Sequence, residues 1–176
     1  MLRPRYSLRL AAVSVLVFAV SVGLAGCTPA PTGRSATATE QQIESIPGVA
    51  SAVTHVTRSQ DGLTTTQIVA ITVVVSDGYH ISDADAAIVW ITREAWSAGP
   101  RRPSVIGFSF DNASGQPLDW GWKAALAARG WDVPLIDGNM EASNVIGLSG
   151  SNMISLTGES WPGPVPETPA NLFVKN

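Results

Sequence analysis

The chain has 176 residues and a formal net charge of −3; 45% of its residues are hydrophobic and only 14% are charged. It contains one cysteine and two histidines, which excludes an internal disulfide, a zinc site built on several cysteines and a three-histidine zinc site. No stretch of the sequence supplies the basic stripe that nucleic-acid binding requires, so we expect no nucleic-acid partner.

The first 26 residues have the organisation of an export signal. Residues 1–9 carry three arginines and no acidic residue, and residues 10–24 are mainly apolar. A basic segment followed by an apolar one is typical of a secretory signal peptide. The apolar segment leads into Leu24-Ala25-Gly26-Cys27, which resembles the lipobox of bacterial lipoproteins at all four positions.

This resemblance implies a role for each lipobox residue. Cys27 would receive a diacylglyceryl group on its sulfur, bringing fatty acids such as palmitate. A signal peptidase that recognises Leu24, Ala25 and Gly26 would cleave before Cys27, and the lipid would hold the mature chain on the extracytoplasmic face of the cell membrane. The alternative is a spanning helix, for which residues 10–26 reach only the short limit.

Cleavage before Cys27 would make the chain more acidic and leave it on a tether. Three of the 11 basic residues would be lost and none of the 14 acidic ones, so 8 basic and 14 acidic residues give a net charge of −6. That charge does not favour attraction to anionic lipid head groups. Residues 28–39 are rich in Pro, Thr and Ala, so residues 27–39 are expected to be the lipidated cysteine and a flexible tether with a reach of about 20 Å.

Residues 40–157 are expected to form a single domain that opens with a helix and a hairpin. A capping box of Thr39 and Gln42 predicts a helix over residues 39–46. Two strand patterns flank Asp61-Gly62, a strong hairpin signal. These strands cover residues 49–57 and 64–75, and the second one places Val69, Ile71, Val73 and Val75 on the face expected to meet helices.

The remaining elements alternate between helix and strand. A second capping box, Ser82 with Asp85, predicts a helix over residues 83–97. We further expect strands over residues 105–110, 144–148 and 153–157, a helix over residues 117–129, and an irregular Pro-rich tail over residues 158–176.

This order predicts an α+β fold, a two-layer sandwich in which a mainly antiparallel sheet carries helices on one face. The segment Ile46-Pro47-Gly48-Val49, followed by a hairpin and a helix, is similar to ferredoxin-like and BON-type envelope domains over residues 40–110. The glycine pattern of BON strands is missing. Such a resemblance implies an architecture and no activity.

An acidic cluster is the first candidate site. Asp77, His80, Asp83 and Asp85 have suitable side chains for a divalent metal or for acid–base work, but no EF-hand spacing is present. The same residues also suit a turn followed by a helix start, where acids are favoured by the helix dipole. We favour the second interpretation.

The six tryptophans are the second candidate. Trp90 lies off the apolar stripe of its predicted helix, and Trp120 and Trp122 are two residues apart and cannot share a helical face. Exposed tryptophans often mark binding surfaces, so Trp90, Trp120 and Trp161 are candidates. The alternative, that they cover the core, is the one we favour.

The sequence predicts a non-catalytic binding or structural module of the cell envelope, acting on an envelope protein or a cell-wall component. The alternative is an envelope enzyme or regulator that uses the Asp77–Asp85 cluster. No serine-hydrolase, phosphate-loop or dinucleotide motif occurs, and no cofactor is expected. The second face of the sheet, which carries Ile68 and Thr72, is expected either to lie under the tail through Trp161 or to bind the partner.

Overall fold

The structure is a computed structural model that describes residues 32–131, 145–158 and 160–176. It confirms the α+β class. The helices are α2 (Ala36–Glu44), α3 (Ala84–Trp96), α4 (Trp122–Ala128) and α5 (Gly150–Thr157). The strands are β1 (Val49–Asp61), β2 (Thr64–Val75), β3 (Tyr79–Ile81), β4 (Val105–Asp111), β5 (Ile146–Ser149) and β6 (Phe173–Lys175). None of the helices in these ranges is long and apolar enough to cross a bilayer. The lipobox lies outside the described residues.

The main sheet has the strand order β1-β2-β4-β5, and β3 pairs with β6 in a small second sheet. The predicted hairpin is confirmed, because β1 and β2 run antiparallel with Asp61 opposite Thr64. Gly62 turns the chain at a φ of 57°, which suits glycine. The sheet is mixed: β4 pairs antiparallel with β5 but parallel with β2, and α3 forms the crossover between β2 and β4.

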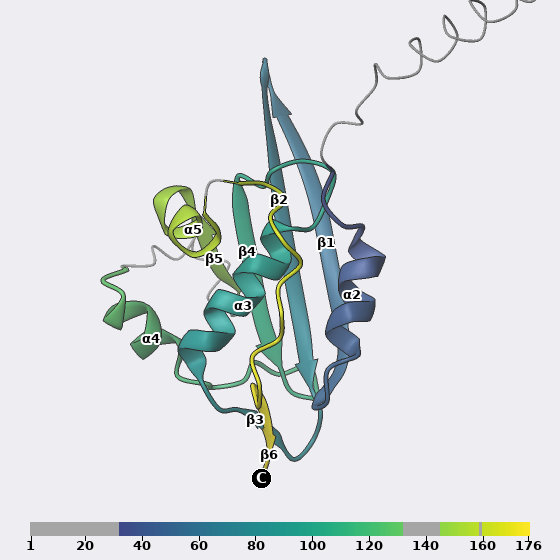
Figure 1. The fold of residues 1–176 in the computed structure, drawn as a ribbon, viewed down its shortest axis with the longest axis vertical. Coiled ribbons are helices and arrows are strands. Elements are labelled where there is room, and N and C mark those ends of the chain that lie inside the picture. Colours follow the sequence, from purple (N-terminus) through teal and green to yellow (C-terminus); the bar gives the residue numbers. More distant parts are fainter. Residues whose placement is uncertain (1–31, 132–144, 159) are drawn as a thin grey trace, which may run out of the picture. The chain divides into compact units, whose positions relative to one another are not determined.

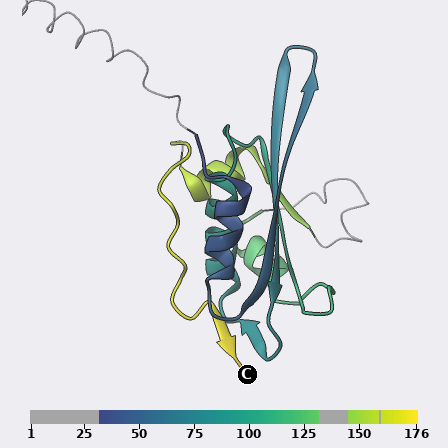
Figure 2. The same ribbon diagram turned by 90° about the vertical axis from the view of Figure 1, so that its right-hand side faces the viewer.

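The helices cover one face of the main sheet, so the fold has two layers (Figures 1 and 2). The β-branched residues predicted to meet them are all buried, with 2% exposure or less: Val69, Ile71, Val73 and Val75. Each such side chain contributes about 1.5–3 kcal/mol by leaving water. The buried residues Ala87, Ile88, Ile91 and Ala95 form an apolar stripe along α3, which packs on β2 and β4.

The first helix begins earlier than predicted. Ser35 is the N-cap of α2, because its hydroxyl accepts a hydrogen bond from the Ala38 N–H at 3.1 Å. Thr39 is buried inside the helix and donates to the Ser35 carbonyl, so it caps nothing. The folded domain therefore begins before residue 40. Arg34 already pairs with Ala98 in an isolated β-bridge, which shortens the expected tether.

The cap of α3 is also displaced by one residue. Asp83, not Ser82, is the N-cap, and its carboxylate accepts from the Ala86 N–H at 3.0 Å. Ser82 instead donates to the carbonyl of Asn171 at 2.6 Å, in the tail. The predicted capping box of Ser82 and Asp85 is thus wrong, because a long-range contact recruits the serine.

Two predictions in the second half of the chain are wrong. The helix expected over residues 117–129 is limited to α4, because Pro117 forms a bridge with Asp111 and Leu118 donates to the Phe110 carbonyl at 2.9 Å. The strand expected over residues 153–157 belongs to the helix α5. Its buried residues, Met153 and Leu156, are three apart, which is a helical spacing.

The tail runs over the outer side of the helix layer and not over the second face of the sheet (Figure 2). The indole N–H of Trp161 donates to the Trp96 carbonyl at 2.8 Å, and that of Trp96 donates to the Ser160 carbonyl at 3.0 Å. At its end the tail is regular, since β6 pairs with β3. The expectation that Trp161 covers the sheet is therefore wrong.

Candidate functional site

The acidic cluster does not form a common site. Asp83 is used as a helix cap, and Asp85 binds Arg129 at 2.6 Å. The Nδ1 atom of His80 lies 2.6 Å from the Asn176 side-chain oxygen, and Asp77 is exposed in a turn. Within the described ranges, no three His, Cys, Asp or Glu side chains are arranged to hold a metal ion. Each member is accounted for by a cap, a pair or a turn.

The three candidate tryptophans contribute to packing. Trp90 is only 1% exposed and meets Phe173 edge to face, with ring centroids 6.1 Å apart. Trp120 is half-buried against Phe110 at 4.8 Å, and Trp161 is half-buried beside Trp96. Trp90 therefore cannot form part of a surface, which corrects its prediction as a candidate. It lies off the stripe that faces the sheet but is covered by the chain's C-terminal end.

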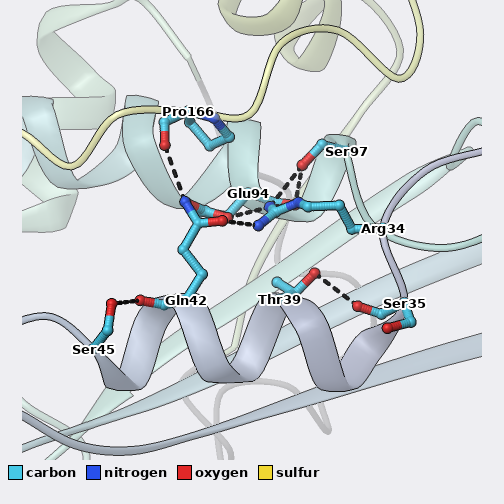
Figure 3. A network of polar contacts seen from close by, with 8 residues as sticks. All are labelled: Arg34, Ser35, Thr39, Gln42, Ser45, Glu94, Ser97 and Pro166. Carbon is cyan, nitrogen blue, oxygen red and sulfur yellow. Dashed lines mark hydrogen bonds and ion pairs between the residues drawn. The ribbon is translucent and has the colours of Figure 1, made fainter.

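The structure contains a buried polar network that the sequence did not indicate (Figure 3). The guanidinium of Arg34 donates to the carboxylate of Glu94 and to the side-chain oxygen of Gln42. It also donates to the Ser97 hydroxyl at 2.8 Å. The Gln42 amide donates to Glu94 at 3.2 Å and to the Pro166 carbonyl at 3.2 Å. Three separate segments of the chain meet at this point: residues 34–42, residues 94–97 and the tail at Pro166.

The centre of this network is the Glu94 carboxylate, which is fully buried, whereas the Arg34 side chain is 16% exposed. Burial raises the pKa of Glu94, and the hydrogen bond and charge of Arg34 act in the opposite direction. Arg34 and Gln42 both donate hydrogen bonds to the Glu94 side chain, so the residue at position 94 must be a hydrogen-bond acceptor. Arg34 Nε is buried without a partner among the described residues, whereas the other two guanidinium nitrogens of Arg34 are paired within the chain. The arrangement suits a clamp that fixes the start of the domain.

A sequence signal for Glu94 does exist. Ala87, Ile91 and Glu94 are spaced as one apolar row of α3, so a charged residue stands in a core position. Such a residue requires a buried partner. The partner could not be identified from the sequence, because Arg34 lies 60 residues away in a segment without periodicity.

The second face of the main sheet carries the remaining candidate surface. Three cross-strand pairs of β1 and β2 form what we call the open face: Val53 with Thr72, His55 with Ala70, and Thr57 with Ile68. Val53 is 43% exposed and Ile68 is 37% exposed, and His55 and Thr57 are also exposed. No described helix lies on this side (Figure 2). On β4, which lies between β2 and β5, the same side of the sheet is less exposed: Ser109 is buried, and its hydroxyl donates to the Thr72 hydroxyl at 3.0 Å.

A groove of about 450 Å³ also runs between α3 and the tail. Arg93, Trp96 and Glu167 lie along it with several prolines of the tail, and Trp96 is almost completely buried.

The chain matches no protein-family model, and no characterised protein or solved structure resembles it closely enough to count as a relative.

Proposed function

We propose that the protein is a lipid-anchored lipoprotein of the cell envelope whose domain binds another protein through the open face. The resemblance of Leu24-Ala25-Gly26-Cys27 to a lipobox supports the anchor, and the clamp limits how far the domain would lie from it. Cys27 and Arg34 are separated by six residues, and Arg34 is held by Glu94, Gln42 and Ser97. The seven residue steps from Cys27 to Arg34 span at most about 25 Å, so lipid on Cys27 would keep the domain close to the membrane.

The open face has the composition of a protein-binding surface. Two exposed aliphatic side chains, Val53 and Ile68, stand among small and polar neighbours on a regular sheet. The His55–Ala70 pair lies between them, so the open face presents two separate aliphatic side chains with polar and small side chains between, a mixture that suits contact with another protein. A flat sheet face of this kind presents no concave site for a small substrate, which favours a protein partner over catalysis.

A photo-cross-linking amino acid at position 53 tests this surface in the cell that makes the protein. We expect one discrete adduct of higher mass, in which mass spectrometry finds one partner sequence. A second probe at Thr72, the cross-strand neighbour of Val53, should trap the same partner.

The matched control is the same amino acid at Ala127, which is exposed on α4. It should give no such adduct. Loss of the adduct in an Ile68→Lys background would locate the contact on the open face, because a charge would be desolvated on binding. Identical adducts from positions 53 and 127, or none from position 53, would contradict the proposal.

A further inference from the structure

The end of the domain at which the folded chain begins also carries a projecting hairpin. Arg34 exchanges backbone hydrogen bonds with Ser97 and Gly99, at 2.8 and 2.7 Å. A Cβ atom at Gly33 would collide with the carbonyl oxygens of the same two residues, so only glycine allows the backbone to approach this closely. Gly99 in turn packs against Gln67 of β2. The link to Cys27 therefore leaves the domain beside the middle of the β1–β2 hairpin.

Beyond that level no other strand of the described residues pairs with the hairpin. The last contact of β2 with the rest of the sheet is at Gln67 and Ile68, where the Ser104 N–H donates to the Gln67 carbonyl at 2.7 Å. From Gln67 to Leu63 the strand rises about 13 Å. Figures 1 and 2 show this tip standing clear of the other elements. Its rise is less than the greatest distance that the seven residue steps from Cys27 to Arg34 can span, about 25 Å.

The tip combines an apolar residue with nearby positive charge. Leu63 is 104% exposed, more than any other large hydrophobic residue of the described ranges. Arg58 lies opposite Gln67 in the hairpin, and the Gln67 side chain donates to the backbone of Arg101. Arg58, Arg101 and Arg102 are all exposed. Asp61 is the acidic residue of the tip, and strand alternation directs it to the opposite face from Arg58.

We propose that this end of the domain docks on the anionic surface of the membrane that carries the anchor. Leu63 enters the lipid interface, and Arg58, Arg101 and Arg102 contact anionic head groups. The inference rests on the proposed lipidation of Cys27. Because the lipid would hold the domain at the membrane, the positive charge of the three arginines would matter more for docking than the net negative charge of the mature chain. Each arginine near an anionic membrane strengthens attachment roughly fivefold, and an aliphatic side chain adds an apolar term.

A single fluorescent label on the lipidated mature protein tests the docking. Cys27 is the only cysteine and its sulfur would be blocked by the thioether bond to the diacylglyceryl group, so Thr64→Cys supplies a unique thiol beside Leu63. The labelled protein is placed in vesicles of phosphatidylcholine with phosphatidylglycerol. We expect the emission of an environment-sensitive dye to shift to shorter wavelength and to be quenched by spin-labelled lipids. In vesicles of phosphatidylcholine alone the shift should be smaller.

The control label is Ala113→Cys, in the exposed turn that follows β4 at the other end of the strands. It should report water in both vesicle types. Leu63→Asp should abolish the shift at position 64. Replacing the three arginines with glutamine should remove most of the dependence on phosphatidylglycerol.

The two proposals fail in different ways. Protein that floats with the vesicles but gives the same water-like emission at positions 64 and 113 would overturn the docking and leave the anchor intact. So would a shift that Leu63→Asp does not change. Protein that is unmodified at Cys27 and stays in the aqueous phase would overturn the lipoprotein proposal, and the docking with it.

Discussion

Truncation of the chain after Thr157 should abolish cooperative folding. Leu172 and Phe173 of the tail are only 2% and 7% exposed, and the Trp161 indole is hydrogen-bonded to the Trp96 carbonyl. Removing one buried Leu or Phe side chain costs about 2–5 kcal/mol, and small domains have about 5–15 kcal/mol in total. The loss should therefore approach the whole stability. Urea unfolding followed by tryptophan fluorescence measures it.

Two point variants test whether the stability depends on the buried side chains of the tail or only on its length. Phe173→Ala should lower the free energy of unfolding by about 3–5 kcal/mol. Val165→Ala, at a tail residue that is 55% exposed, should change it by less than about 0.5 kcal/mol. A truncated chain that unfolds at the same urea concentration as the complete one would show that the tail does not belong to the core.

Loss of the buried ion pair of Arg34 and Glu94 should cause the second-largest loss of stability, and removing Arg34 should cost more than removing Glu94. Arg34→Ala leaves the Glu94 carboxylate buried without its cation, which costs about 3–5 kcal/mol. Glu94→Ala should cost less, because the Arg34 side chain is 16% exposed and can turn toward water. Arg129→Ala is the matched control, since its partner Asp85 is 56% exposed, and should cost less than about 1 kcal/mol.

The Arg34→Ala effect should grow with pH. Burial already raises the pKa of Glu94 above the value of 4.5, and loss of Arg34 removes the main influence that lowers it. A raised pKa means that the folded chain holds a proton which the unfolded chain releases, so stability falls as pH rises above the unfolded value. The slope should approach about 1.4 kcal/mol per pH unit until Glu94 ionises. The double variant Arg34→Ala/Glu94→Ala should lack this added slope; if it retains it, another group is responsible.

The sequence predicted best where the pattern is local. The alternation of Val69, Ile71, Val73 and Val75 and the Asp61-Gly62 turn specify the hairpin and its buried face, because both signals act within a few residues. The caps were predicted less well. Ser82 and Asp83 both suit an N-cap, and the choice depends on the contact of Ser82 with Asn171.

The features that the sequence did not predict depend on contacts between residues far apart in the chain. The tail has no periodicity, and its position depends on Trp161 meeting Trp96, 65 residues away. Trp90 was a candidate for a binding surface because it lies off the apolar stripe of its helix, but Phe173 packs against it there, in line with the favoured interpretation that the tryptophans cover the core. The clamp could not be predicted for the same reason, since Arg34 and Glu94 meet only in the folded chain.

The mass of the mature N-terminus tests the central claim most directly. In the bacterium that makes the protein, the account predicts that the chain begins at Cys27 and carries a diacylglyceryl group there, and that the protein remains with the membrane after high-salt washing. Cys27→Ala should prevent lipid labelling and leave the precursor with residues 1–26 attached. A mature chain that begins elsewhere, or a Cys27→Ala protein that is still processed and lipid-labelled, would contradict the lipoprotein proposal.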